Sequence, residues 1–89
     1  MSHWRVQTSR RFDRELERID RATASRILDY LEETESLGHP RLRGKGLTGD
    51  LAGLWRYRVG DYRILVEIHD EALVVLAIGV GHRSRIYRD

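Results

Sequence analysis

Three arginines alternate with large apolar residues in the stretch from Leu54 to His69, and arginine side chains can bind phosphate. The stretch reads L-W-R-Y-R-V-G-D-Y-R-I-L-V-E-I-H, two alternating runs that meet at Gly60-Asp61, a dipeptide suited to a two-residue hairpin turn. With this turn, Arg58 lies opposite Arg63, and Arg56 comes next on the same face. Like charges directly across a strand pair are unfavourable, so the arrangement predicts a site for an anion. The alternative is that these arginines form only a solvated face.

The same register places the large apolar residues of both strands on the other face. A shift of one residue would bury the arginines and expose the aromatic rings, so the register is well specified. The opposing apolar pairs are Val59–Tyr62, Tyr57–Ile64 and Trp55–Val66.

More polar residues follow near the end of the chain, where His82, Arg83 and Tyr87 occur in the segment G-H-R-S-R-I-Y-R. Beside the arginines of the hairpin, they suit cleavage of RNA without a metal ion. The 2′-hydroxyl of RNA supplies the nucleophile, arginines stabilise the charged transition state, and a histidine or tyrosine moves a proton. Two alternatives stay open: His82 could be structural, and Tyr87 could pack in the core or stack on a base.

Other chemistries lack the residues that they need. The chain has no cysteine, which excludes disulfides and thiolate sites. Its four histidines show no metal-ligand spacing, and Asp61, Asp70 and Glu71 fall in predicted turns rather than in a cluster, so we expect no metal and no other cofactor. Gly44-Lys45-Gly46 lacks the strand-to-helix context of a phosphate-binding loop.

The length and composition predict one domain spanning residues 1–89, with a net charge of +2. The order of its expected strands and helices makes it an α+β domain. Of its 16 cationic residues all but Lys45 are arginine, which favours phosphate recognition, although a GC-rich genome would produce the same bias. No apolar run approaches the roughly 20 residues that span a bilayer. The first residues also lack the apolar segment of a signal peptide, so we expect no membrane contact and a cytoplasmic location.

Two helices should cover the apolar face of the sheet. A short strand over residues 3–8 is followed by a helix capped by Ser9, and a second helix runs from Asp20 to about Ser36, with Gly38 as its terminator. We expect the two helices to form an antiparallel hairpin with packed apolar stripes. These stripes are Phe12, Leu16 and Ile19 in the first helix, and Ala24, Ile27, Leu28 and Leu31 in the second.

Residues 38–53 form a predicted loop with Arg41, Arg43 and Lys45 at alternate positions. These residues are either a rim that binds a polyanion or ordinary loop polarity. A last strand over residues 72–80 then completes a three-stranded antiparallel meander. It is apolar on both faces, and we expect its small residues Ala77 and Gly79 on the arginine side. Its larger residues, Val74, Leu76 and Ile78, should then face the helices.

Two motifs and the order of the elements carry a resemblance to a known family. The motifs are L-x-G-D-L-A-G-L-W-R-Y-R-V-G-D-Y-R-I-L, from Leu47 to Leu65, and V-G-H-R-S-R-I-Y-R, from Val80 to Arg88. Together they resemble the RelE/ParE superfamily of bacterial toxin–antitoxin toxins, specifically its RelE branch. The resemblance implies a RelE-like microbial RNase-type fold and a ribosome-dependent endoribonuclease that cuts mRNA. It also implies inhibition by a RelB-like antitoxin, with DNA contacted only through the toxin–antitoxin complex.

By motif position, the resemblance implies an active site formed by Arg56, Arg63, Arg83 and Tyr87. A well-studied RelE type has two lysines where this chain has Leu54 and Arg56. Arginine is a poor general base because its pKa lies above about 12, so His82, with a reference pKa of about 6.5, becomes the candidate proton acceptor. Further RNA contacts are expected from Arg41, Arg43, Lys45, Arg58 and Arg85. The alternatives are a ParE-like inhibitor of DNA gyrase without nuclease activity, and a degenerate member that only binds its antitoxin.

Overall fold

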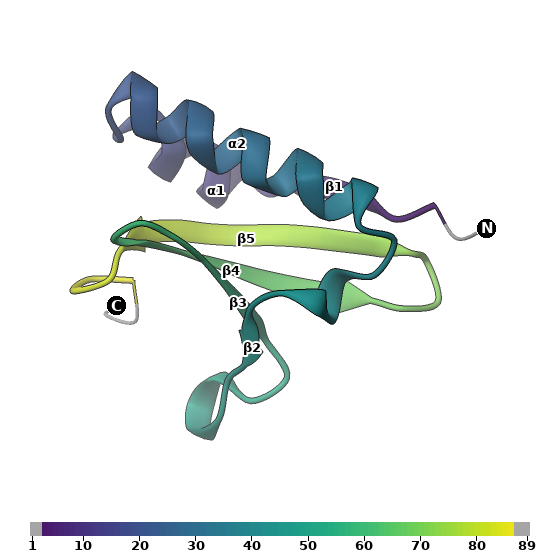
Figure 1. Cartoon of the computed structure of the whole chain (residues 1–89). Coiled ribbons are helices and arrows are strands. Elements are labelled where there is room, and N and C mark those ends of the chain that lie inside the picture. Colours follow the sequence, from purple (N-terminus) through teal and green to yellow (C-terminus); the bar gives the residue numbers. More distant parts are fainter. Residues whose placement is uncertain (1–2, 87–89) are drawn as a thin grey trace.

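A computed structural model describes residues 3–86 as two layers, with two helices lying over one face of a five-stranded sheet (Figure 1). The elements are β1 (Arg5–Thr8), α1 (Arg10–Glu17), α2 (Arg21–Ser36), the 3₁₀ turn η1 (Pro40–Leu42), β2 (Lys45–Gly46), the 3₁₀ turn η2 (Gly49–Leu51), β3 (Trp55–Val59), β4 (Tyr62–His69) and β5 (Val74–His82). Neither helix in this part of the chain is long and apolar enough to cross a membrane.

The strands follow the order β1-β5-β4-β3-β2, with β1 parallel to β5 and every other pair antiparallel. The predicted α+β class is therefore confirmed, as is the three-stranded meander. The structure adds β2, which lies inside the segment expected to be a loop and pairs with β3. A strand of two residues is too short to produce an alternating pattern in the sequence.

Both helices begin at the capping residues that the sequence indicated. The Ser9 hydroxyl accepts a hydrogen bond from the Phe12 N–H at 3.1 Å, and the Asp20 carboxylate accepts one from the Thr23 N–H at 3.0 Å. Each cap satisfies a backbone donor that the first helical turn leaves without a partner. Gly38 follows α2 with φ of 80°, a conformation that glycine adopts without steric cost.

The hairpin register is confirmed over its whole length. Arg58 pairs with Arg63, and the aromatic and aliphatic pairs occur as expected. Their face forms the core against the helices, where Phe12 of α1 and Tyr57 of β3 are fully buried. The other buried members of this core are Trp4, Ile27, Leu31, Val59, Ile64, Val66, Val75, Ala77 and Val80.

The expected orientation of β5 is wrong. Ala77 is fully buried in the core, and a β-carbon at Gly79 would lie 3.2 Å from the Glu15 carboxylate of α1, so both face the helices. The side chains of Val74, Leu76 and Ile78 are only half-buried and lie outside the core cluster. Because this strand is apolar on both faces, its sequence pattern does not indicate which face packs against the helices. Pairing of Ala77 with Val66 decides the orientation, and an irregularity next to Val66 then shifts the register.

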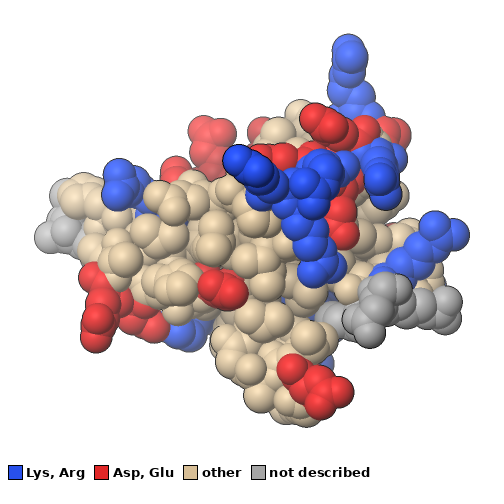
Figure 2. All heavy atoms as spheres, turned by 180° about the vertical axis from the view of Figure 1, so that it is seen from behind, with Lys and Arg blue, Asp and Glu red and all other residues tan. Residues whose placement is uncertain are grey.

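Two helix carboxylates bind the backbone of the sheet. Glu15 of α1 accepts a hydrogen bond from the Val80 N–H at 3.0 Å, close to the irregularity in β5. Glu35 of α2 accepts one from the Val6 N–H at 2.7 Å, on the edge strand β1. Elsewhere on the helical layer, positive and negative side chains are interleaved at the surface (Figure 2). Most of the helical charge is therefore solvated, as the sequence suggested. Glu15 and Glu35 are exceptions, because they link the helices to the sheet by hydrogen bonds.

Candidate functional site

Four cationic residues share the face of the sheet that the helices leave uncovered. Residues paired across an antiparallel ladder point to the same side, and the structure pairs Arg58 with Arg63 and Lys45 with Arg56. Their side lies opposite the buried Tyr57 and Ile64. We call Lys45, Arg56, Arg58 and Arg63 the arginine face.

Hydrogen bonds and burial fix part of this face. The Arg63 guanidinium donates to the carbonyl oxygens of Gly60 and Tyr62, at 3.1 and 3.2 Å, which holds it beside the hairpin turn. Arg56 is half-buried, whereas Arg58 and Lys45 are exposed. Planar guanidinium groups in fixed positions offer the paired donors that a phosphate accepts.

The segment after β5 folds back over the same side. Ile86 is buried, and a β-carbon added at Gly81 would lie 3.4 Å from its Cδ1 atom. Gly81 pairs with Arg63, so the absence of a side chain there gives the chain room to cross the sheet next to that arginine. The Ile86 N–H donates to the His82 carbonyl at 3.0 Å and closes this turn.

Arg83 is brought to the hairpin turn by its backbone, because its N–H donates to the Asp61 carbonyl at 2.8 Å. Its side chain and that of Arg85 are exposed. The backbone of Arg83 therefore lies beside the hairpin turn that precedes Arg63. Tyr87, the remaining candidate from the tail, lies outside the described residues.

His82 lies on the other face. It pairs with Tyr62, which packs against the core on the helix side of the sheet. The two rings meet edge to face, with centroids 5.7 Å apart. Its Nδ1 atom accepts a hydrogen bond from the Ser84 N–H at 3.2 Å and lies 2.9 Å from the Ser84 hydroxyl. The structure thus separates the His82 ring from the arginine face. Because Nδ1 is an acceptor, the neutral ring carries its proton on Nε2.

Arg43 is a structural residue whose partners belong to α2. Its guanidinium donates to the Tyr30 carbonyl at 3.0 Å and to the Thr34 hydroxyl at 2.8 Å, and it forms an ion pair with Glu33 at 3.2 Å. It also lies 3.7 Å from the centre of the Tyr30 ring. The Arg43 carbonyl in turn accepts a hydrogen bond from Trp55 Nε1 at 2.8 Å. These contacts turn its donors towards α2, away from the arginine face.

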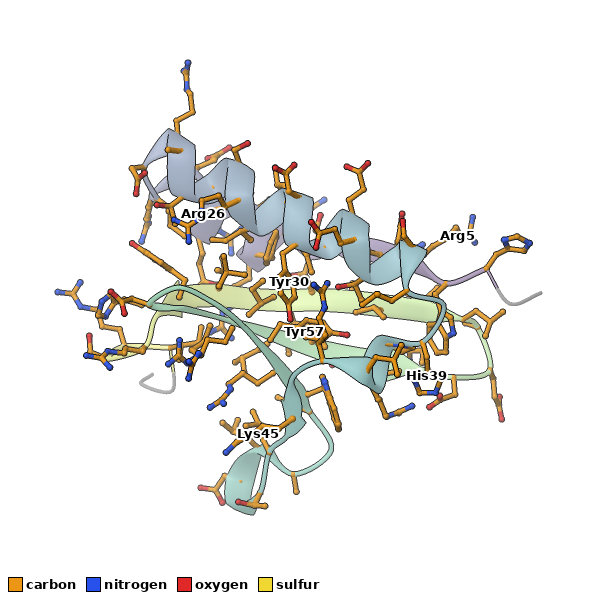
Figure 3. All side chains as sticks on the ribbon, in the orientation of Figure 1. Arg5, Arg26, Tyr30, His39, Lys45 and Tyr57 are labelled. Carbon is orange, nitrogen blue, oxygen red and sulfur yellow. The ribbon has the colours of Figure 1, made fainter. Side chains whose placement is uncertain are left out.

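Arg41 is bound to the turn between β4 and β5. Its guanidinium makes two hydrogen bonds to the Asp70 carboxylate, at 2.8 and 2.9 Å, and these bonds lower the pKa of Asp70. Next to it, the Tyr57 hydroxyl donates to the Pro40 carbonyl at 2.6 Å, and burial raises the pKa of Tyr57 to about 12. Figure 3 shows Tyr57 directly below Tyr30, on the sheet side of α2. The sequence analysis did not predict these contacts. The signal that could have indicated them is the pair Trp55 and Tyr57, two aromatic residues of β3 that each carry a hydrogen-bond donor.

Of the five expected RNA-binding residues, the structure therefore brings Lys45 and Arg58 into the arginine face and leaves Arg85 exposed on the tail. Arg41 and Arg43 instead anchor the loop after α2. Within residues 3–86, no group of three or more histidine, cysteine or acidic side chains is arranged to hold a metal ion.

The fold is that of a small RelE/ParE-type toxin domain. Residues 6–87 match the family model described as the ParE toxin of the type II toxin–antitoxin system parDE. The chain therefore belongs to this toxin family.

Two curated relatives come from Mycobacterium tuberculosis. The chain is 35% identical to the toxin RelE over 75 residues, which are 84% of this chain and 76% of that protein. It is 47% identical to the toxin RelG over 45 residues, 51% of this chain, and this match spans only 52% of the length of RelG.

Solved structures agree on the fold. The RelBE2 toxin–antitoxin complex of M. tuberculosis contains a chain with a TM-score of 0.83 and 27% identity, with 94% of this chain and 95% of that chain covered. The RelE–RelB complex of Pyrococcus horikoshii gives a TM-score of 0.72 at 26% identity, with 94% and 99% covered. The isolated RelE toxin of Escherichia coli gives 0.71 at 22% identity, with 91% and 84% covered.

Proposed function

We propose that this protein is a toxin that cleaves mRNA in the ribosome without a metal ion. The observation that carries the proposal is the arginine face, where Arg58 and Arg63 stand directly opposite each other and Lys45 stands opposite Arg56. Like charges directly opposite each other repel, and a bound phosphate chain would offset that repulsion. The resemblance to RelE toxins supports mRNA as the polyanion.

The proposed reaction is a transesterification within the RNA strand. The 2′-hydroxyl loses its proton and attacks the adjacent phosphorus, and the 5′ oxygen of the next nucleotide leaves and takes up a proton. The products are a 2′,3′-cyclic phosphate and a 5′-hydroxyl. Arg56 and Arg63 would neutralise the extra negative charge that develops on the phosphoryl oxygens, with Arg83 as a third donor. For Tyr87 we propose stacking on a base or donation of the departing proton.

We further propose a RelB-like antitoxin as the partner, because structural neighbours occur as RelB–RelE complexes. Its inhibitory segment should carry acidic residues towards the arginine face, and binding should weaken as salt rises. Contact with DNA would then come only through the toxin–antitoxin complex. Since ribosomes are the proposed site of action, the protein would work in the cytoplasm.

Translation in a purified system, with mRNA ends mapped by primer extension, tests the nuclease. We expect new 5′ ends within codons, and we expect Arg63→Gln and Arg83→Ala to reduce them by roughly 10²-fold or more. Arg5→Gln is the matched control, because Arg5 is exposed on β1 and pairs with Val74, at the opposite end of β5 from Gly81, the partner of Arg63. Intact mRNA with folded wild-type toxin would overturn the proposal.

The second candidate function is inhibition of DNA gyrase, favoured by the family model, which is described as a ParE toxin. In that case the arginine face would bind the antitoxin or gyrase itself. A supercoiling assay run beside the translation assay separates the two. Stalled gyrase–DNA complexes with intact mRNA would establish the ParE-type activity for this chain.

A further inference from the structure

A pocket of about 310 Å³ opens next to the arginine face, in the segment that links β2 to β3. Its lining residues are Lys45, Gly46, Leu47, Thr48, Leu51 and Arg56. Figure 1 shows this segment projecting from the sheet on the side away from the helices, and Figure 3 places Lys45 at its base. We propose that this pocket binds one nucleobase of the RNA and gives cleavage its base preference, an inference that rests on the proposed RNA-binding function.

The position of the pocket relates it to the phosphate-binding residues. Lys45 and Arg56 are cross-strand partners, and such pairs have β-carbons about 5 Å apart. Both also line the pocket. A phosphate held by Arg56 therefore places the base of the same or the adjoining nucleotide at the mouth of the pocket.

The lining has the chemistry of a base site. The half-buried Leu47 and Leu51 offer apolar surface to the faces of a base, and the Thr48 hydroxyl can pair with polar atoms on its edge. Thr48 precedes η2, but its side chain makes no capping hydrogen bond there. Its hydroxyl can donate and accept, so it can read a base edge.

The pocket is built before any ligand arrives, because backbone hydrogen bonds close its walls. The Leu47 N–H donates to the Leu54 carbonyl at 3.0 Å, and the Leu51 N–H donates to the Thr48 carbonyl at 3.3 Å. At its base, Gly44 brings the chain so close to β3 that a β-carbon would lie 2.3 Å from the Arg56 carbonyl oxygen. A preformed site loses little conformational entropy on binding.

Binding of 2′-O-methyl trinucleotides of A, C, G and U tests the pocket without cleavage, because the blocked 2′ oxygen cannot attack. Methyl NMR signals of Leu47, Thr48 and Leu51 should shift on binding, by amounts that differ among the four bases. Signals of Leu42, which is 65% exposed in η1 and outside the pocket, should stay in place. Unchanged signals at the three pocket residues, or equal shifts with all four bases, would overturn the inference.

Thr48→Val keeps the shape of the side chain and removes its hydroxyl. We expect it to reduce the ratio of dissociation constants between the weakest and the tightest trinucleotide by roughly tenfold, the worth of one good hydrogen bond. The base preference at mapped ribosomal cleavage sites should flatten in the same variant, but not in the control Leu42→Ala. A preference unchanged by Thr48→Val would exclude the pocket as its source.

The two experiments fail separately. Base-dependent methyl shifts together with intact ribosomal mRNA would refute the nuclease and leave the nucleobase pocket supported. Efficient cleavage by a toxin whose pocket methyl signals ignore the base would refute the pocket and leave the nuclease supported.

Discussion

Arg58 and Arg63 lie directly opposite each other across the β3–β4 ladder, on the face of the sheet that the helices leave uncovered. Directly opposed like charges destabilise a strand pair. The pair of arginines therefore lowers the folding stability of the free toxin and, in the proposed function, raises its affinity for a polyanion.

Replacing Arg58 with threonine should separate these two effects. Threonine favours strands, so Arg58→Thr should raise the free energy of unfolding by roughly 0.5 kcal/mol in urea titrations. It should also weaken binding to single-stranded RNA by roughly three- to tenfold, with a smaller dependence on salt. Arg5→Thr, the same change on an exposed strand position that pairs with Val74, should leave RNA affinity unchanged. An unaltered affinity in Arg58→Thr would make Arg58 part of a merely solvated face.

Gly44 controls the position of β2, because the chain there has φ of 80° and passes against β3. A β-carbon would lie 2.3 Å from the Arg56 carbonyl oxygen and 2.8 Å from Trp55 Nε1. Gly49 also has positive φ, at 64°, but has open space around it. Both alanine variants should lose about 1 kcal/mol of stability from the backbone conformation, and Gly44→Ala should lose roughly 1–3 kcal/mol more from overpacking. Equal losses in urea titrations would contradict this account of β2.

Tyr57 should make stability sensitive to alkaline pH. Its hydroxyl donates to the Pro40 carbonyl, so Tyr57→Phe should cost about 1–3 kcal/mol near pH 8. The folded-state pKa of Tyr57 is raised from 10.0 to about 12, so its contribution is complete below pH 10 and is lost as the pH rises towards 12. Over that interval the difference in unfolding free energy between wild type and Tyr57→Phe should shrink. Phe12→Leu removes no titratable group, so its cost should stay constant. A Tyr57→Phe cost that does not change with pH would refute the raised pKa.

The sequence predicted those parts of the structure that depend on local pattern. The register of β3 and β4 followed from strict alternation around Gly60-Asp61. The orientation of β5 did not, because its apolar residues occupy both faces and the choice depends on pairing with Val66. Arg43 was misread for a related reason: its partners Tyr30 and Thr34 lie in α2, and only the folded chain brings them within hydrogen-bonding distance. Long-range contacts of this kind have no signature in composition or spacing.

His82 is the residue for which sequence and structure lead to opposite expectations. The sequence made it the candidate proton acceptor, because its reference pKa of about 6.5 suits proton transfer and arginine is a poor base. The structure places its ring against Tyr62, on the face opposite Arg63, with Nδ1 occupied by the Ser84 N–H. From this geometry we expect His82→Gln to change mRNA cleavage by less than about fivefold, well below the 10²–10⁴-fold typical of a general acid or base.

The measurement is the single-turnover rate of cleavage of ribosome-bound mRNA between pH 5.5 and 8.5, with Arg63→Gln as the comparison that should lose activity. Ser84→Ala serves as the matched control, because it removes the hydroxyl near Nδ1 and keeps the backbone donor. If the geometric interpretation holds, wild type and both tail variants share one pH–rate profile. A fall of 10²-fold or more in His82→Gln, together with a changed pH–rate profile, would establish His82 as the proton acceptor. It would also mean that the end of β5 turns this ring towards the arginine face when RNA binds.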